Sequence, residues 1–162
     1  MNKAVYLSLG SNLGDREANL RVAVERLQTN DVKVLQVSSI YETEPQDFLE
    51  QPWFLNIALQ GETTLFPKQL LSRIRKIQTE MGGKRTIPKG PRTIDIDILL
   101  LGNFLMETPE LTIPHPRMTE RRFVLEPLIE IAPNLRHPRL RRALAEMLGA
   151  TRDQAVKKLC AW

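Results

Sequence analysis

The stretch G-P-R-T-I-D-I-D-I-L-L-L, residues 90–101, decides how the rest of the chain is arranged. Its apolar and acidic residues alternate, which predicts a β-strand. One face would carry Ile94, Ile96, Ile98 and Leu100, and the other Asp95, Asp97, Leu99 and Leu101. Because residues two apart in a strand share a face, the two aspartates stand side by side, roughly 6–7 Å apart at the backbone. We therefore expect two carboxylates that point the same way from one strand.

This acid pair needs compensation, because burying a carboxylate in an apolar run is costly without a cation, a proton or strong donors. Oxygen ligands with no His or Cys alongside suit a hard divalent ion such as magnesium, which keeps several waters and also binds phosphate oxygens. The alternative is that the acids lie on an edge strand and pair with Arg85 or Arg92. The pattern alone leaves both interpretations open.

Cations flank the acid pair on both sides in the sequence. Lys84, Arg85 and Arg92 precede it, and His115 and the Arg121-Arg122 pair follow it. Arginine binds phosphate in a planar, two-pronged manner and spreads the charge that builds on phosphoryl oxygens. A lone histidine between two prolines is also common as a structural or solvated residue. Acids for a metal and flanking cations together indicate nucleotide phosphate chemistry.

Hydrophobic periodicity outlines the elements around this strand. Strands are predicted over residues 4–9, 32–42 and 53–62, and helices over residues 16–28 and 67–81. With the acid strand, the order is strand, helix, strand, strand, helix, strand. This order predicts an α+β, ferredoxin-like β-α-β-β-α-β fold, an antiparallel sheet with helices packed on one face. Short C-terminal helices are predicted over residues 123–131, 140–148 and 152–159.

Length and composition favour one cytoplasmic domain. The chain has 162 residues and 42% hydrophobic content, enough for a single domain over 1–162 with a substantial core. The one cysteine, Cys160, cannot form an intramolecular disulfide, which favours a reducing compartment. The first residues lack the apolar core of a signal peptide, and no run approaches about 18 apolar residues. We expect no membrane association.

Positive charge gathers in the last quarter of the chain. Residues 117–162 carry ten Lys and Arg against five Asp and Glu, and the whole chain has a net charge of +4. A basic surface there could face a nucleotide's phosphates, a nucleic acid or only solvent.

A glycine-containing turn follows the first strand, G-S-N-L-G-D at residues 10–15. It lacks the third glycine of a dinucleotide-binding fingerprint, and the chain has no G-x-x-x-x-G-K-S/T motif. One interpretation is a turn that caps the following helix through Asp15. The other is a set of backbone donors that face a ligand.

Five motifs in order resemble one known family. They are G-S-N-L-G-D at residues 10–15, Y-E-T-E-P at 41–45, F-L-N at 54–56, G-P-R-T-I-D-I-D-I-L at 90–99 and L-T-I-P-H-P at 111–116. Together they closely resemble the 6-hydroxymethyl-7,8-dihydropterin pyrophosphokinases of folate biosynthesis, in register to about Pro133. The resemblance implies a magnesium-dependent enzyme that transfers a pyrophosphoryl group from ATP to the pterin hydroxymethyl group and releases AMP.

The resemblance also implies roles for the residues that bind ATP. In that family two magnesium ions lie between two aspartates and the triphosphate, which carries over to Asp95 and Asp97. Arg92, His115 and Arg121 would contact the phosphates or ribose. Leu111 and Thr112 would line the adenine side, and Arg85 resembles a mobile-loop arginine that helps close the active site.

The pterin side of the site follows from the same matches. The ring would stack between Phe54 and Phe123, while Asn56 and the polar groups around Thr43 and Glu44 read its edge. This accounts for Asn56, a polar side chain on an apolar strand. We expect small-molecule substrates, no nucleic-acid partner and a monomer.

The chain departs from many relatives at a few positions. Many relatives have an acid in the second helix, an arginine at the start of the mobile loop and an R-W pair before G-P-R-T, where this chain has Gln78, Gly83 and Pro88-Lys89. Glu110 stands where some relatives have an arginine. These departures concern adenine contacts and loop closure, and they leave both aspartates in place.

Two other functions compete with the enzyme. Ferredoxin-like sheets also form RNA-binding modules, but this chain lacks the K/R-G-F/Y-G/A-F run of such modules, and acids on the sheet would repel phosphate without a metal. A relative that keeps the fold without catalysis is disfavoured because both metal ligands, Arg92 and His115 are present.

Overall fold

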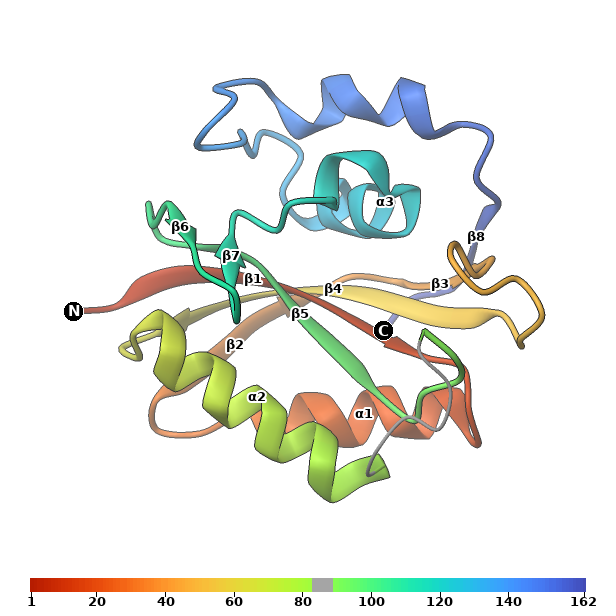
Figure 1. The fold of residues 1–162 in the computed structure, drawn as a ribbon, viewed down its shortest axis with the longest axis horizontal. Helices are drawn as coiled ribbons and strands as arrows, with labels where there is room; N and C mark the ends of the chain where they lie inside the picture. The colour runs from red at the N-terminus through yellow and green to blue at the C-terminus, as the bar shows by residue number, and fades with distance from the viewer. Residues whose placement is uncertain (83–88) are drawn as a thin grey trace.

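An antiparallel sheet forms the middle layer of the computed structural model, which describes residues 1–82 and 89–162 (Figure 1). Its strands are β1 (Lys3–Ser11), β2 (Val32–Val37), β3 (Ile40–Thr43), β4 (Phe54–Thr63), β5 (Asp95–Leu101) and β8 (Val156–Cys160). They follow the order β5-β1-β4-β3-β8, and β2 also pairs with β4. A separate hairpin joins β6 (Met106–Glu107) to β7 (Thr112–Ile113). The predicted antiparallel β-α-β-β-α-β arrangement is confirmed.

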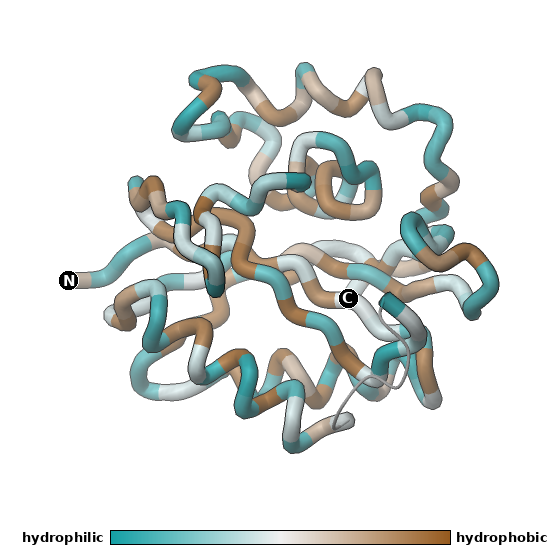
Figure 2. The backbone as a smooth tube through the Cα atoms, viewed as in Figure 1, coloured by the Kyte–Doolittle hydropathy of each residue, from teal (hydrophilic) through white to brown (hydrophobic). Residues whose placement is uncertain are grey.

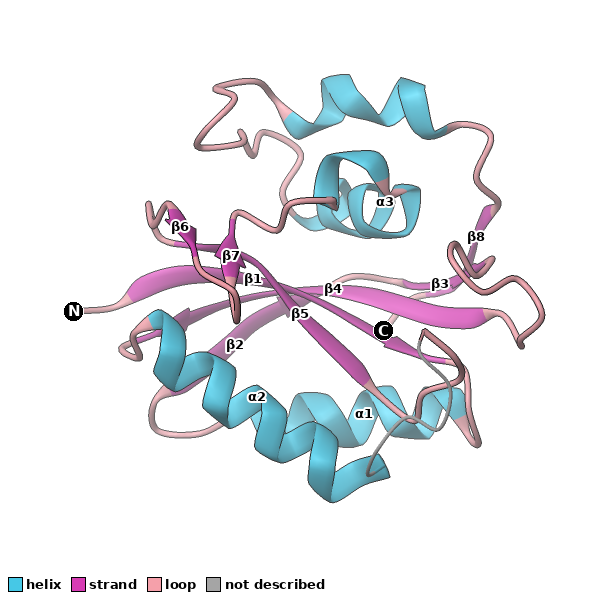
Figure 3. Ribbon diagram, viewed as in Figure 1, coloured by secondary structure: helices cyan, strands magenta, loops and turns pink. Residues whose placement is uncertain are grey.

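Helices cover both faces of this sheet (Figure 3). On one face lie α1 (Arg16–Leu27) and α2 (Pro67–Gly82), as the sequence predicted. The other face is covered by α3 (Arg122–Ile131) and a 3-10 helix, Leu144–Thr151; a second 3-10 helix, Met118–Glu120, precedes α3. The C-terminal helices therefore build a third layer. None of the helices in the described residues is long and apolar enough to cross a bilayer.

Two apolar clusters hold the layers together. Val5, Leu7 and Leu9 of β1 belong to the cluster under α1 and α2, as their alternation predicted. Leu125 and Leu128 of α3 belong to the second cluster, on the opposite face. Figure 2 shows apolar residues alternating with polar ones along strands that run between the helical layers. Burying both faces of the central strands fixes their register, because a one-residue slip would exchange the two faces.

The alternation of β5 breaks near its end. Leu7 pairs with Ile98 and Tyr6 with Leu100, so Leu99 is an extra residue, a β-bulge. The bulge places Leu99 and Leu100 together in the α3 cluster and returns Leu101 to the other cluster. The prediction was right through Ile98 and wrong for Leu100 and Leu101, because a bulge shifts every later residue to the opposite face.

The predicted strand over residues 32–42 is two strands, β2 and β3, separated by Ser38 and Ser39. The Ser38 side chain accepts a hydrogen bond from the Ala58 N–H at 2.9 Å, in place of a backbone carbonyl. Ser39 donates its N–H and its hydroxyl to one carboxylate oxygen of Glu130 in α3, at 3.0 and 2.9 Å. Serine side chains compete with the ladder for backbone partners, so they interrupt the strand and tie it to α3.

The C-terminal predictions were partly wrong. Helix α3 confirms the helix predicted over 123–131. The helix predicted over 140–148 overlaps the 3-10 helix Leu144–Thr151 only in its second half. The second half of the helix predicted over 152–159 is instead strand β8, which pairs with β3. The edge of β3 offers unpaired backbone groups that β8 satisfies, and this long-range pairing decides the conformation.

Candidate active site

A cavity of about 260 Å³ opens at the end of the sheet where β1, β4 and β5 meet the start of α3. It is lined by Ser8, Gly10, Thr43, Glu44, Pro45, Gln46, Asp47, Gln51, Phe54, Asn56, Lys89, Asp95, Asp97, His115, Arg121 and Phe123. Nine residues predicted for the site are in this set: Thr43, Glu44, Phe54, Asn56, Asp95, Asp97, His115, Arg121 and Phe123. The structure thus gathers residues from distant parts of the chain around one space.

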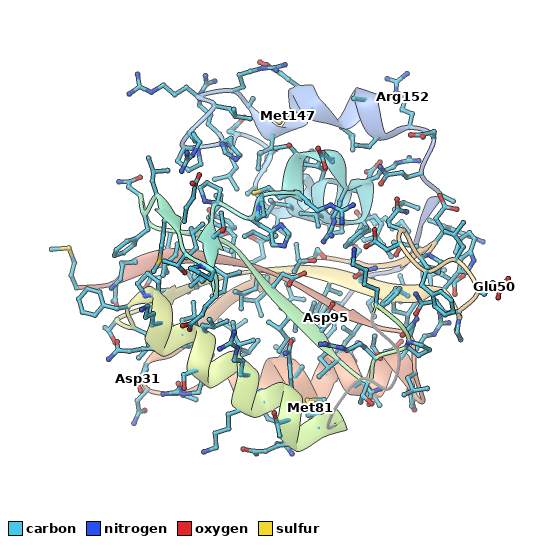
Figure 4. The ribbon with its side chains drawn as sticks, in the orientation of Figure 1. Asp31, Glu50, Met81, Asp95, Met147 and Arg152 are labelled. Atoms are coloured by element: carbon cyan, nitrogen blue, oxygen red, sulfur yellow. The ribbon has the colours of Figure 1, made fainter. Side chains whose placement is uncertain are left out.

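The acid pair lies on the β5 wall of the cavity, where Figure 4 labels Asp95. Asp95 is in register with Gly10 of β1, and Asp97 with Ser8. Cross-strand partners share a face, so the two small residues leave space beside both carboxylates. Both aspartates are half-buried.

Arg92 forms an ion pair with Asp95, with 3.1 Å between Nη1 and Oδ1. The acids are thus on an edge strand, and Asp95 has an arginine partner, which is part of the alternative that the sequence left open. The Nε atom of Arg92 is buried without a hydrogen-bond partner among the described residues. Arg92 does not line the cavity itself and contacts it through Asp95.

Asn12, from the glycine-containing turn, holds three loops together. Its Oδ1 accepts from the Arg92 N–H at 2.8 Å, and its Nδ2 donates to Gln51 Oε1 and to the Pro52 carbonyl, both at 2.9 Å. Asn12 is almost fully buried, so these hydrogen bonds satisfy an otherwise costly polar group. Asp15 caps α1 by accepting from the Ala18 N–H at 3.1 Å. The turn-and-cap interpretation of this motif is confirmed.

The opposite end of the cavity combines aromatic rings with a buried amide. Phe54 begins β4 and Phe123 lies in the first turn of α3; both are half-buried. Asn56 is buried, and its Nδ2 donates to Thr43 Oγ1 at 2.6 Å. That contact orients the amide, and it leaves the Asn56 Oδ1, the second Nδ2 hydrogen and the rings as groups that a flat heterocycle could meet.

His115 and Arg121 form the cationic side of the cavity. Burial, and then the charges of Arg121 and Arg117, lower the pKa of His115 to about 4. His115 Nδ1 accepts from the Arg117 N–H at 3.2 Å, which assigns the ring proton to Nε2. Burial, and then the charge of Arg117, lower the pKa of Arg121, while Asp97, Asp47 and Asp95 act in the other direction. The histidine is therefore a neutral donor beside a charged guanidinium.

The Arg121 guanidinium also contacts the aromatic end of the cavity. Its central carbon lies 5.4 Å from the centroid of the Phe123 ring. Its Nε atom is buried without a hydrogen-bond partner among residues 1–82 and 89–162. An anionic ligand that accepts a hydrogen bond from such a buried donor gains the most binding free energy.

Besides Arg92, two of the described residues predicted for the site, Leu111 and Thr112, do not line the cavity. Thr112 belongs to the β6–β7 hairpin, and Leu111 packs against the cluster under α1 and α2. Arg85 lies outside the described residues. Across the described ranges, no three His, Cys, Asp or Glu side chains gather into a ready-made metal site.

Sequence reasoning missed several polar residues that line the cavity, notably Gln46, Asp47 and Gln51. They belong to the segment between β3 and β4, which reads only as turn-like. Asp47 makes ion pairs with Lys89 at 3.7 Å and Arg117 at 3.4 Å. Gln51 donates to the Phe48 and Lys89 carbonyls at 2.6 and 3.0 Å. The Y-E-T-E-P motif just before this segment was the available signal.

Two of the positions at which the chain departs from many relatives make side-chain contacts in the structure. Gln78 of α2 accepts a hydrogen bond from the Ile96 N–H at 2.7 Å, and so supports the strand that carries the acid pair. Glu110 is 4.0 Å from Arg75 on the surface.

The C-terminal segment joins two walls of the cavity. Gln154 accepts from the Arg122 N–H through Oε1 at 2.8 Å and donates to the Glu120 carbonyl through Nε2 at 2.7 Å. The next residue, Ala155, donates its N–H to Glu44 Oε1 at 2.9 Å. Arg122 lies between Arg121 and Phe123, so these contacts connect the start of α3 to the β3 side of the cavity.

Fold and site together define a ferredoxin-like α+β domain whose cavity joins an acid pair and cations to aromatic rings. A family model for 7,8-dihydro-6-hydroxymethylpterin-pyrophosphokinase (HPPK) matches residues 6–133. The chain belongs to this family.

Individual relatives agree with the family match. The chain is 51% identical to the 2-amino-4-hydroxy-6-hydroxymethyldihydropteridine pyrophosphokinase of Bacillus subtilis, over 81% of this chain and 79% of that protein. It is 42% identical to the enzyme of the same name from Aquifex aeolicus, over 96% of this chain and 95% of that one. The folic acid synthesis protein fol1 of Pneumocystis carinii is also 42% identical, but the chain spans only 21% of its length.

Solved structures show the same fold. The chain resembles a crystal structure of an HPPK-DHPS in complex with substrates, with a TM-score of 0.74 and 16% identity, over 93% of this chain and 43% of that one. An HPPK-DHPS of Plasmodium falciparum gives a TM-score of 0.72 at 17% identity, over 92% of this chain and 42% of that one.

Proposed function

We propose that the protein transfers a pyrophosphoryl group from ATP to the hydroxymethyl group of 6-hydroxymethyl-7,8-dihydropterin, a step of tetrahydrofolate biosynthesis. The observation that carries this proposal is one cavity, in a chain of this family, that places Asp95 and Asp97 opposite Asn56 and two phenylalanines. We assign the activity to one domain over residues 1–162, acting as a monomer in the cytoplasm on small molecules alone.

The reaction joins the pterin hydroxyl oxygen to the β-phosphorus of ATP. The bond between that phosphorus and the oxygen bridging to the α-phosphorus breaks, AMP leaves, and the hydroxyl proton is lost. The protein's contribution is to align the two substrates and to offset charge on the phosphoryl oxygens.

We propose that Asp95 and Asp97 hold two magnesium ions together with the triphosphate. The donor set fits, because two carboxylates without nearby thiolates suit a hard cation, and Ser8 and Gly10 leave space beside them. Bound there, magnesium would neutralise phosphate charge and orient the α- and β-phosphates. Arg92 would then exchange part of its contact with Asp95 for a phosphate oxygen.

His115 and Arg121 are proposed to bind the phosphates. Support comes from the buried Nε donor of Arg121 and from the neutral His115 ring, whose Nε2–H can donate to an anion. Arg85 and Arg92 complete the proposed set of catalytic cations. The adenine would lie beside Leu111 and Thr112, beyond the cavity described above.

The pterin is proposed to stack between Phe54 and Phe123. Asn56 and the groups around Thr43 and Glu44 would read its ring edge. Because the Asn56 Nδ2 already donates to Thr43, its Oδ1 is the acceptor for a pterin N–H, and Thr43 fixes that orientation. Glu44 already accepts from the Ala155 N–H through Oε1, and its own N–H donates to the Ala155 carbonyl at 3.1 Å, so its second carboxylate oxygen is the group proposed for the ligand.

A nucleotide product assay tests the proposal. Purified protein, ATP, magnesium and 6-hydroxymethyl-7,8-dihydropterin are incubated, and AMP and ADP are separated by chromatography. We expect AMP only when pterin and magnesium are both present. ADP would identify an ordinary kinase, and an absence of product despite ATP binding would identify a binding protein.

A further inference from the structure

Asp47 lies where three segments meet at the cavity. It comes from the loop between β3 and β4 and lines the cavity with a carboxylate that is 32% exposed. Its Oδ2 is 3.7 Å from Lys89 Nζ, just before the acid strand, and its two oxygens are 3.4 and 3.5 Å from Arg117 Nη1, just after His115. One acid at the cavity therefore pairs with two cations that come from segments distant in the sequence.

These cations share the surroundings of the proposed phosphate-binding residues. Lys89 lines the cavity together with Asp95, Asp97 and Arg121. Arg117 lies near enough to His115 and Arg121 that its charge lowers the pKa of both. The charge of Asp47 reaches Arg121 as well, and acts on it in the opposite direction. A polyanion that enters the cavity therefore meets Lys89 and Arg121 in its wall, with Arg117 next to them.

The ion pairs of Asp47 are of the kind that exchange readily. The side chains of Lys89 and Arg117 are 62% and 42% exposed, and such partly solvated pairs are weak. A triphosphate offers more negative charge than one carboxylate, and arginine binds it with two parallel donors.

Resting on the proposed function, we propose that Asp47 is an internal counterion that occupies Lys89 and Arg117 in the empty cavity and yields them to the phosphates of ATP. Lys89 and Arg117 are then two further phosphate-binding residues. Asp47 keeps them in place at the cost of competing with the nucleotide.

The test is nucleotide affinity without chemistry. Calorimetry measures the Kd of the α,β-methylene analogue of ATP with magnesium and without pterin. For Asp47→Asn we expect the Kd to fall by about two- to tenfold, the effect of releasing weak ion pairs. The gain should shrink in an Arg117→Gln or Lys89→Gln background, and each of these substitutions alone should raise the Kd.

Asp31→Asn is the matched control. Asp31 forms an ion pair with Arg73 at 3.1 Å and, as Figure 4 shows, lies far from Asp95. Losing this acid changes the net charge equally, so its Kd should stay close to that of the unsubstituted protein.

The outcomes separate this inference from the proposed function. If the unsubstituted protein binds the analogue and Asp47→Asn binds it equally or less tightly, Asp47 is not a competing counterion and only this inference is overturned. A gain that persists unchanged when both Arg117 and Lys89 are replaced also overturns it. If the unsubstituted protein does not bind the analogue, the proposed function fails and this inference with it.

Discussion

Gly10 of β1 faces Asn56 of β4 so closely that no side chain fits between them. The two residues are in register, and a Cβ on Gly10 would lie 2.5 Å from Asn56 Oδ1. On its other side Gly10 is in register with Asp95 of β5. Gly10 thus lies on the strand between the proposed pterin-binding amide on β4 and the proposed metal ligand on β5, and it places no side chain between them.

Replacing Gly10 with alanine should therefore damage the pterin end of the site first. The new methyl group would push the Asn56 amide away from Thr43, and overpacking of this kind costs about 1–3 kcal/mol of stability. We expect the KM for pterin to rise at least about tenfold, with a smaller change for ATP, in steady-state kinetics. Gly149→Ala is the control, because nothing lies within 4 Å of a Cβ placed there. Equal losses for both substrates would contradict a local effect on Asn56.

Asp97→Ala tests the role of the acid pair. We expect turnover to fall by at least about a thousandfold, because a metal ligand supplies several kcal/mol of charge stabilisation. The melting temperature should stay nearly unchanged or rise, since the substitution removes a like charge beside Asp95. Product formation and thermal melting are measured on the same sample, with Asp31→Ala as the control. A large fall in melting temperature with activity retained would instead assign Asp97 a structural role.

Local patterns predicted the two-helix half of the fold well. The alternation of Val5, Leu7 and Leu9 and the cap at Asp15 depend only on neighbouring residues, so both can be predicted from the local sequence. The bulge at Leu99 depends on a distant partner, Tyr6, and the break at Ser38 and Ser39 depends on Ala58 and Glu130. Hydrophobic periodicity depends only on neighbouring residues and cannot indicate such distant partners. It could not indicate β8 either, because β8 is a strand through its pairing with β3.

The candidate site divides in the same way. Motifs identified Asp95, Asp97, Asn56 and His115 because their residue types are chemically distinctive in apolar surroundings. Asp47 and Gln154 carry no such signature. They contribute through contacts between loops and through a C-terminal segment that follows the family match, so only a three-dimensional arrangement reveals them.

The histidine titration gives a pH-dependent prediction. The unfolded pKa of His115 is about 6.5, and burial with the charges of Arg121 and Arg117 lowers the folded value to about 4. Between these values the unfolded chain binds a proton that the folded protein does not. The stabilisation from a neutral His115 is thus fully present above about pH 6.5 and is lost as pH falls toward 4.

NMR measures this directly, because the chain has only two histidines, His115 and His137. We expect the His115 ring signals to stay constant from pH 8 to about pH 5.5 and to move only at lower pH. A His115→Gln variant assigns the signals and should lose this component of the pH dependence of its unfolding free energy. A titration midpoint near 6.5 would mean that His115 is solvated in the folded protein.

Gln154 is predicted to position the pterin site from outside the family match. Its amide holds the backbone at Arg122 and Glu120, while the adjacent Ala155 holds Glu44. Gln154→Ala removes two hydrogen bonds worth about 1 kcal/mol each, which should lower the melting temperature by about 4–8 °C. Because Phe123 and Glu44 lose their common support, the KM for pterin should rise several-fold, with little change in the nucleotide Kd.

Gln28→Ala separates positioning from general destabilisation. The Gln28 side chain also accepts a backbone hydrogen bond, from the Val34 N–H at 2.9 Å, but it does not line the cavity. A purely structural role for Gln154 predicts that both variants lose stability and keep the same KM for pterin. A raised KM in Gln154→Ala alone, measured well below both melting temperatures, would show that the C-terminal segment sets the spacing between Phe123 and the β3 wall. A Gln154→Glu variant retains the acceptor toward the Arg122 N–H and should recover part of the loss.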